Sequence, residues 1–157
     1  MTDPELRDWP VTAPGYRRSE VTAVVGRGDE VWERAARDVL LWRVKTASGF
    51  SVDSTGPVSE GDHVVVTARL LGTTIVEPVD VVAVVRESDR VGFSYRTLPG
   101  HPVRGEEAFI VHRDGDEVRI TVRSLTRAAS QQPWRSLYPL LMVAQRIARR
   151  RYLRSLR

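Results

Sequence analysis

The segment that decides the fold is residues 108–123, which read Ala-Phe-Ile-Val-His-Arg-Asp-Gly-Asp-Glu-Val-Arg-Ile-Thr-Val-Arg. Apolar residues dominate before Asp114-Gly115, and apolar and polar residues alternate strictly after it. An Asp-Gly pair between two such runs is a strong signal for the tight turn of a β-hairpin. The segment therefore predicts two antiparallel strands in direct succession, each directing one face toward a core.

Further β-like runs precede this hairpin and are separated by turn-forming residues. These runs are 20–25, 42–47, 64–70, 73–77, 79–85 and 91–95, with a long loop at 48–62. Pro78 cannot donate a backbone hydrogen bond, so it requires a bulge or an edge position between two of the runs. With the hairpin, the chain is expected to form about six to seven antiparallel strands.

Two segments have helical periodicity. Asp29 is a good N-cap for an amphipathic helix of about 12 residues. A second helix is predicted from Ser136 to Leu156, which would span about 31 Å and places Pro139 in the tolerated first turn. We therefore predict an α+β fold, in which a curved antiparallel sheet of about 6–7 strands wraps around the long C-terminal helix. Such a sheet often leaves a cavity between its concave face and the helix.

The length of 157 residues favours one domain, which we divide into an irregular N-terminal arm at 1–15 and a single α+β domain at 16–157. The absence of cysteine excludes disulfides and thiolate chemistry. No apolar run is long enough to span a bilayer, and the polar first residues do not form a secretory signal. We expect a soluble, cytoplasmic protein.

The net charge of +4 is unevenly distributed, because residues 146–157 contain six arginines and no acidic residue. The remainder of the chain is slightly acidic and offers no basic stripe, so nucleic-acid binding is not expected. Cations at a helix C-terminus are favourable, although the same arginines could bind phosphates or an anionic membrane. Lys45 is the single lysine, and we attribute its rarity to codon usage in a GC-rich genome.

Several common catalytic motifs are absent. Gly26-x-Gly28 lies between a strand and a helix, but a phosphate loop is rejected because a third glycine is missing and Asp29 would repel the phosphate. The three histidines have no metal-binding spacing. No Gly-x-Ser-x-Gly motif occurs. Neither a metal nor an organic cofactor is expected.

Residues 97–109 read Thr-Leu-Pro-Gly-His-Pro-Val-Arg-Gly-Glu-Glu-Ala-Phe. This loop combines two prolines, two glycines, a histidine and two carboxylates, more residues with special backbone or proton chemistry than any other stretch of the chain. Pro99-Gly100 suits a type II turn, and Pro102 forces His101 into an extended conformation. The loop is therefore expected to be rigid. It is interpreted either as a structural turn with a bonded glutamate or as the lining of a functional pocket.

Glu106 and Glu107 are neighbours in a predicted strand, so they point to opposite faces and do not form an acid–base pair. The carboxylate on the concave face requires a raised pKa or an arginine partner, for which Arg96 and Arg104 are the candidates. An apolar wall is expected from the strands and the C-terminal helix, with Val91 and Ala144 as further members. The candidate ligand-binding residues are Tyr95, Arg96, His101, Glu106, Glu107, Phe93, Phe109 and Leu141.

Residues 95–102, Tyr-Arg-Thr-Leu-Pro-Gly-His-Pro, together with Gly105-Glu106-Glu107-x-Phe109, resemble the domain-of-unknown-function nineteen-ninety family of small bacterial and plant proteins. Gly26-x-Gly28 and Arg150-Arg151-Tyr152-Leu153 are also similar, so the resemblance extends from about residue 16 to residue 156. The resemblance implies, by analogy, a helix-grip fold of the START and Bet v 1 type. The family's activity is unassigned, so no catalytic residue is carried over.

Three functions follow as hypotheses. The leading one is the binding of a small hydrophobic molecule between the sheet and the C-terminal helix, oriented by His101 and one glutamate. The second is a cyclase-like or hydratase-like enzyme in the same cavity, with His101 or a glutamate as general base beside Tyr95. The third is an interaction module that uses the arginine-rich tail. Monomer and homodimer both remain open.

Overall fold

The computed structural model describes residues 1–10, 13–70 and 72–157. The strands are β1 (Arg17–Arg27), β2 (Phe50–Val52), β3 (His63–Leu70), β4 (Thr73–Arg86), β5 (Arg90–Thr97), β6 (Val103–Asp114) and β7 (Glu117–Ala128). The helices are α1 (Asp29–Leu40), α2 (Arg43–Thr46) and α3 (Trp134–Tyr152). Within the described residues, no helix is both long and apolar enough to cross a lipid bilayer.

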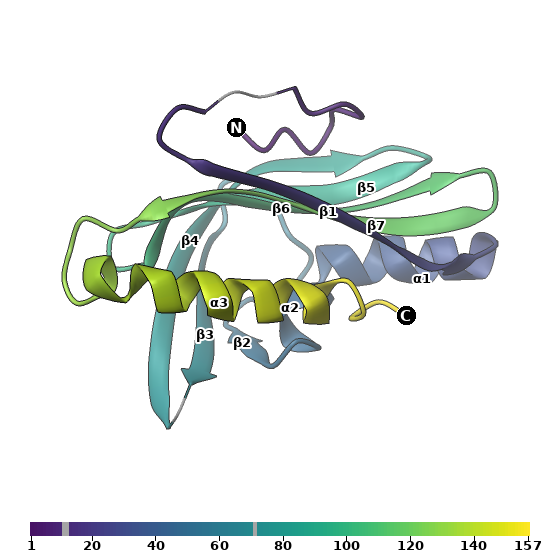
Figure 1. Ribbon diagram of the computed structural model, residues 1–157. Helices are drawn as coiled ribbons and strands as arrows, with labels where there is room; N and C mark the ends of the chain where they lie inside the picture. The colour runs from purple at the N-terminus through teal and green to yellow at the C-terminus, as the bar shows by residue number, and fades with distance from the viewer. Residues whose placement is uncertain (11–12, 71) are drawn as a thin grey trace.

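The described strands form one antiparallel sheet in the order β1-β7-β6-β5-β4-β3-β2. The sheet curls, and all three helices lie on its concave side (Figure 1). This is the predicted α+β architecture, a curved sheet of seven strands that wraps around a C-terminal helix. The fold class is therefore confirmed.

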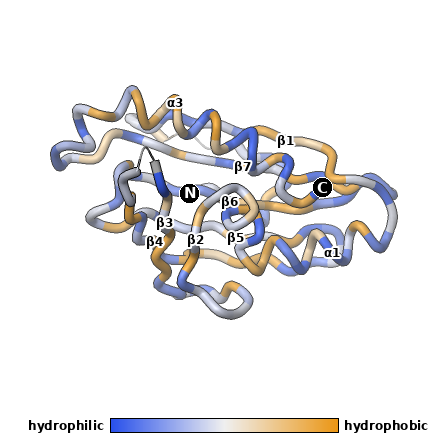
Figure 2. The backbone as a smooth tube through the Cα atoms, turned by 90° about the horizontal axis from the view of Figure 1, so that it is seen from below, coloured by the Kyte–Doolittle hydropathy of each residue, from blue (hydrophilic) through white to orange (hydrophobic). Residues whose placement is uncertain are grey.

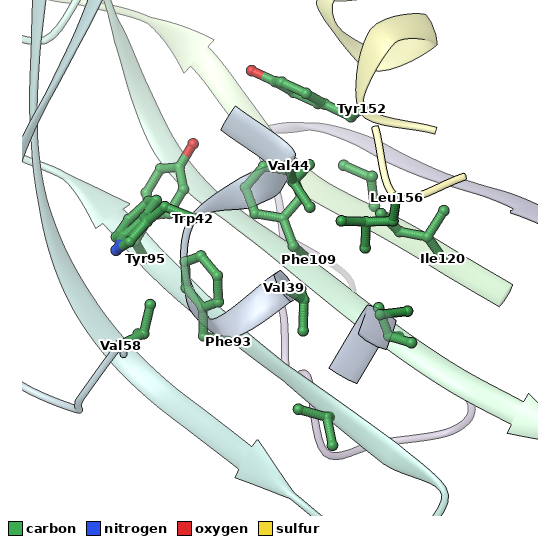
Figure 3. Close-up of a cluster of buried hydrophobic side chains, with 14 of the residues drawn as sticks. Val39, Trp42, Val44, Val58, Phe93, Tyr95, Phe109, Ile120, Tyr152 and Leu156 are labelled. Atoms are coloured by element: carbon green, nitrogen blue, oxygen red, sulfur yellow. The ribbon is translucent and has the colours of Figure 1, made fainter. Parts of the chain in front are cut away.

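An apolar cluster fills the concave side between the sheet and α1, α2 and the end of α3. Phe93 and Phe109 on neighbouring strands are fully buried, and Trp42 contacts Phe93 edge-on with ring centroids 4.7 Å apart. Figure 3 shows that Tyr95 and Tyr152 direct their hydroxyl groups toward the same edge of this cluster. Burial of these large aromatic side chains is the main stabilising contribution to the fold.

The N-terminal segment lies along the opposite, convex face of the sheet (Figure 1). Arg123 on β7 is buried and donates to the carbonyl oxygens of Asp3 (2.7 Å) and Arg7 (3.1 Å). Trp9 is also buried, and the guanidinium of Arg18 lies 4.2 Å from its ring centroid. The segment therefore covers the convex face and is held there by specific hydrogen bonds. A ligand site is accordingly sought on the concave face.

The predicted hairpin is confirmed, because Asp114 pairs with Glu117 and leaves a two-residue turn in which Gly115 has a φ of 61°. Pro78 was predicted to require a bulge or an edge position. It pairs with Val65 of β3 and lies just before the β4–β5 ladder, which begins at Val79, and its carbonyl oxygen accepts from the backbone N–H of Leu98 at 3.0 Å. The missing N–H of Pro78 therefore interrupts no pair of that ladder. The two runs that flank Pro78 form a single strand, β4, with a bulge between Val81 and Ala83.

Other boundaries differ from the sequence prediction. Residues 42–47 were expected to form a strand, but they contain the short helix α2, which begins after Trp42 in a left-handed conformation with a φ of 58°. The aromatic contacts of Trp42 override the strand propensity of this apolar run. β2 lies inside the predicted loop at 48–62, and α3 begins at Trp134 rather than Ser136.

Candidate functional site

A cavity of about 290 Å³ lies between the concave face of the sheet and α3. One wall consists of the side of α3 that faces the sheet, and the opposite wall comes from β3, β4, β5 and the loop before β6. The α3 wall is mainly apolar and includes Leu141, Met142, Ala144, Ile147 and Ala148. The side opposite α3 contributes Ile75 and a group of polar side chains from several elements, which are Lys45 of α2, Glu77 of β4, Tyr95 of β5, His101 of the loop before β6 and Glu107 of β6.

Lys45 is the centre of the polar group. It is 3% exposed, its Nζ donates to the Tyr152 hydroxyl (2.8 Å), and it forms an ion pair with Glu107 Oε2 at 3.2 Å. The same Nζ lies 4.8–5.6 Å from the centroids of four aromatic rings, those of Phe50, Tyr152, Tyr95 and Phe109. Four rings around one ammonium group make a cation–π cage that holds the charge away from water.

Glu107 is the counter-ion of Lys45, and the Tyr95 hydroxyl donates to the same carboxylate oxygen. Burial disfavours the charged amine, but the charge of Glu107 holds the pKa of Lys45 well above its ordinary value. Burial and then the Glu107 carboxylate raise the pKa of the Tyr95 hydroxyl. At neutral pH the cluster therefore contains the Lys45 ammonium, paired with Glu107, and neutral phenols.

His101 is held in one tautomer by its own loop. Its Nδ1 accepts a hydrogen bond from the backbone N–H of Val103 at 3.1 Å. Burial, followed by the charge of Lys45, lowers the pKa of His101 to about 3. The ring is therefore neutral at pH 7, and because Nδ1 is the acceptor, the proton lies on Nε2. That N–H is directed toward β4.

Glu77 on β4 faces His101 across the cavity, with 4.0 Å between Glu77 Oε2 and His101 Nε2. This separation is too long for a hydrogen bond. Burial raises the pKa of the Glu77 carboxyl, and Lys45 and Glu107 act on it in opposite directions. Glu77 and His101 are thus an acceptor and a donor that face each other without a direct bond.

The structure places the sequence-predicted residues in three environments. Tyr95, His101, Glu107 and Leu141 line the cavity, and Glu106 borders it, although its carboxylate lies on the convex side. Phe93 and Phe109 are fully buried in the apolar cluster behind the cavity. Arg96 lies on the surface, where it pairs with Asp80 at 3.2 Å.

Glu106 and Glu107 point to opposite faces, as predicted. The Glu106 carboxylate accepts from the backbone N–H of Thr2 at 2.9 Å on the convex side, whereas Glu107 meets Lys45 on the concave side. The predicted arginine partner for the inner carboxylate was wrong, because the partner is Lys45 rather than Arg96 or Arg104. The short helix α2 carries Lys45 to Glu107, and the strand predicted for 42–47 gave no reason to expect this approach.

The sequence analysis missed Lys45 and Glu77. A signal existed for each: Lys45 is the single lysine of an arginine-rich chain, and Glu77 is a charged residue between the apolar pair Ile75-Val76 and Pro78-Val79. Among the described residues, no three His, Asp or Glu side chains gather closely enough to hold a metal ion. The arrangement offers hydrogen bonds and a neutralised charge pair to a small molecule.

Substitution of Lys45 by Met will destabilise the protein strongly, because it leaves the buried Glu107 carboxyl group without its ion-pair partner. We expect a loss of about 3–5 kcal/mol in the free energy of unfolding, measured by urea denaturation. The double variant Lys45→Met/Glu107→Gln should recover most of it. Arg96→Met, which breaks the exposed pair with Asp80, should cost less than about 1 kcal/mol. Equal losses in Lys45→Met and Arg96→Met would contradict the buried ion pair.

His101 will make the protein less stable in mild acid. Its pKa is about 3 in the folded state and about 6.5 when unfolded, so the unfolded chain alone gains a proton as the pH falls below 6.5. Between pH 7 and 5 this costs about 1–2 kcal/mol, which His101→Gln should abolish. Between pH 7 and 8 the two proteins should have parallel stability curves. Parallel curves below pH 7 as well would show that His101 is not buried in its neutral form.

Comparison with known proteins places the chain in a family. Residues 3–155 match the family described as Domain of unknown function (DUF1990). A UPF0548 protein of Deinococcus radiodurans is 35% identical over 156 residues, which cover 91% of this chain and 78% of the relative. A UPF0548 protein of Arabidopsis thaliana is 26% identical and is covered over 63% of its length, so this chain spans less than two thirds of the plant protein.

Solved structures support the fold. Hypothetical protein jhp0584 of Helicobacter pylori aligns with a TM-score of 0.63 at 13% identity, over 94% of this chain and 88% of its own. A protein of Thermus thermophilus aligns with a TM-score of 0.59 at 14% identity, over 89% of this chain and 94% of its own. Ara h 8.0201 aligns with a TM-score of 0.54 at 14% identity, over 88% and 96%. The fold is of the Bet v 1-like, helix-grip type, and the chain belongs to the DUF1990 family.

Proposed function

We propose that this protein binds a small, mainly apolar molecule in the cavity between the sheet and α3. The observation that carries the proposal is the cavity itself, with an apolar wall on α3 and a compact polar group at the sheet. Small-molecule sites commonly combine a hydrophobic lining with a few fixed polar groups that orient the ligand. The Bet v 1-like fold is compatible with this function but does not select a ligand.

The size of the cavity limits the ligand. Its volume of about 290 Å³ is near the lower end of the range of roughly 300–1,000 Å³ for small-molecule sites. The small side chains of Ala144 and Ala148 leave room for a ligand, since larger side chains at these positions would project into the cavity. A compact molecule fits this volume better than a long-chain lipid does.

Binding agrees with the polar groups better than the enzymatic alternative does. With a pKa of about 3, His101 is a weak general base at neutral pH. Glu107 already accepts a hydrogen bond from Tyr95 and pairs with Lys45, so its carboxyl oxygen is occupied by contacts within the protein. Neither residue has the properties that the enzyme hypothesis required, and both have those of fixed groups that orient a ligand.

A larger side chain that fills the cavity should weaken ligand binding. The uncharged fluorescent probe N-phenyl-1-naphthylamine should bind the native protein saturably at one site, with increased emission. Ala144→Phe projects a ring into the cavity and should weaken binding at least about tenfold. Val143→Phe is the matched control, because Val143 lies on the outer side of α3 and is 54% exposed. Its affinity should equal that of the native protein.

Two outcomes would contradict the proposal. One is the absence of saturable probe binding to the native protein. The other is equal binding by Ala144→Phe and Val143→Phe, which would place the probe outside the cavity. Native mass spectrometry of gently purified protein, followed by solvent extraction, would then identify any ligand carried from the cell.

A further inference from the structure

The side chains of His101 and Glu77, which face each other in the cavity, indicate the chemical class of the ligand. We propose that the two side chains together hold a hydroxyl group, so that the ligand is an uncharged, mainly apolar alcohol or phenol. This inference rests on the proposed binding function and adds the chemical class of the ligand.

The hydrogen-bonding roles of the two residues are complementary. The backbone N–H of Val103 donates to His101 Nδ1, so the neutral ring carries its proton on Nε2 and directs this N–H into the cavity. Glu77 presents carboxyl oxygens to the same space. A hydroxyl group accepts from one partner and donates to the other, whereas a ketone or an ether only accepts. A hydroxyl therefore satisfies both residues at once.

The distance between the two residues fits one bridging oxygen atom. Hydrogen bonds to a hydroxyl are ~2.7–2.9 Å long, so two partners of the same oxygen are typically about 4–4.6 Å apart. The observed separation of 4.0 Å between His101 Nε2 and Glu77 Oε2 lies at the short end of this range. A larger polar head, such as a phosphate, would not fit between them.

The charges around the pair disfavour an ionised head group. Lys45 lies close enough to lower the pKa of His101, so a ligand ammonium at the same place would be repelled as well. Burial is the main reason that the pKa of the Glu77 carboxyl is raised, and the same burial disfavours a ligand carboxylate at this place. Lys45 and Glu107 already pair with each other, so neither is a free counter-ion for a charged ligand. An uncharged head group therefore has the smallest free-energy cost of burial at this site.

The test is a series of ligands that differ only in the head group. 1-Octanol, its isomer 1-methoxyheptane, octylamine and octanoate displace N-phenyl-1-naphthylamine at pH 7, and their inhibition constants are compared. The alcohol should bind at least about tenfold more tightly than each of the others. In Glu77→Leu, octanol and 1-methoxyheptane should bind equally while the probe still binds. Glu60→Leu, at an exposed site, should keep the native preference.

Each outcome separates the two proposals. If the native protein binds all four compounds equally, or prefers the amine or the carboxylate, the hydroxyl inference is wrong and the cavity function stands. If Glu77→Leu keeps the preference for octanol, Glu77 does not hold the hydroxyl. If neither the probe nor any octyl compound binds, the proposed function itself fails.

A separate observation concerns the outer side of α3. Leu140 is 67% exposed, Val143 54% and Ile147 50%, and their spacing places them on one face of the helix. Figure 2 shows that hydrophobic and hydrophilic residues alternate along α3. Residues 118–157 contain no acidic residue and ten arginines, of which Arg150 and Arg154 are exposed.

We infer that this outer face of α3 docks on an anionic lipid surface. A helix with an exposed apolar stripe and arginines beside it lies in the interface plane of a membrane, where acidic head groups complement the arginines. A second copy of the chain is a poorer partner, because the same arginines would oppose each other across the symmetric contact. This inference does not depend on what the cavity holds.

Co-sedimentation with vesicles tests the docking. The protein should bind vesicles that contain about one quarter phosphatidylserine, release them at high salt, and bind poorly to pure phosphatidylcholine. Leu140→Gln/Val143→Gln, at two exposed positions outside the cavity lining, and Arg150→Gln/Arg154→Gln should each reduce binding at least about fivefold. Leu41→Gln, at an exposed leucine after α1, is the control and should bind as the native protein does.

Equal sedimentation with both kinds of vesicle, or with none, would overturn the inference. So would a dimer in light scattering that the Leu140→Gln/Val143→Gln variant dissociates, since the face would then belong to a second copy. Retained binding of N-phenyl-1-naphthylamine in each variant shows that the fold is intact.

Discussion

The ion pair between Lys45 and Glu107 is the interaction on which the concave side depends. A buried charge is tolerated only when it is paired and hydrogen-bonded, so each partner fixes the position of the other. Lys45 comes from α2 and Glu107 from β6, and the Tyr152 hydroxyl adds the end of α3 to the same point. Three segments that are distant in the sequence are therefore held together by one ammonium group. The polar end of the cavity follows from this requirement, because the cavity lies directly beside it.

The alternation of β6 couples this inner cluster to the outer surface of the sheet. Glu107 points inward to Lys45, and its neighbour Glu106 points outward and accepts from the backbone of Thr2. Arg123 and Arg90 reach the carbonyl oxygens of the N-terminal segment on the same outer side. Both faces of the central strands are covered as a result. The outward positions of β7 are mostly polar, and of these Thr121 bonds to Thr22 and His112, and Arg123 to the N-terminal segment.

The sequence predicted the elements better than it predicted the site. Strand alternation and the Asp114-Gly115 turn are local signals, and they were sufficient for the sheet and for the opposite directions of Glu106 and Glu107. Lys45 and Glu77 reach the cavity from segments that lie 62 and 30 residues before Glu107, so no local pattern relates them to it. The contact depends on Trp42, whose left-handed backbone ends α1 and turns the chain into α2. Its aromatic packing, and not the strand propensity of residues 42–47, determines where Lys45 points.

Helix α3 connects the cavity with the outer surface, and its two ends are anchored differently. Near the C-terminal end, Arg149 donates to Ser19 (3.0 Å) and Ser124 (2.9 Å), and Tyr152 bonds to Lys45 in the buried cluster. Nearer the N-terminal end, Tyr138 and Gln145 reach Thr126 with longer hydrogen bonds of 3.4 and 3.3 Å. Local opening is cheapest where buried contacts are fewest. Buried polar contacts therefore anchor the C-terminal end of α3 beside the Lys45–Glu107 pair, and this end sets the position of the apolar wall opposite the polar group.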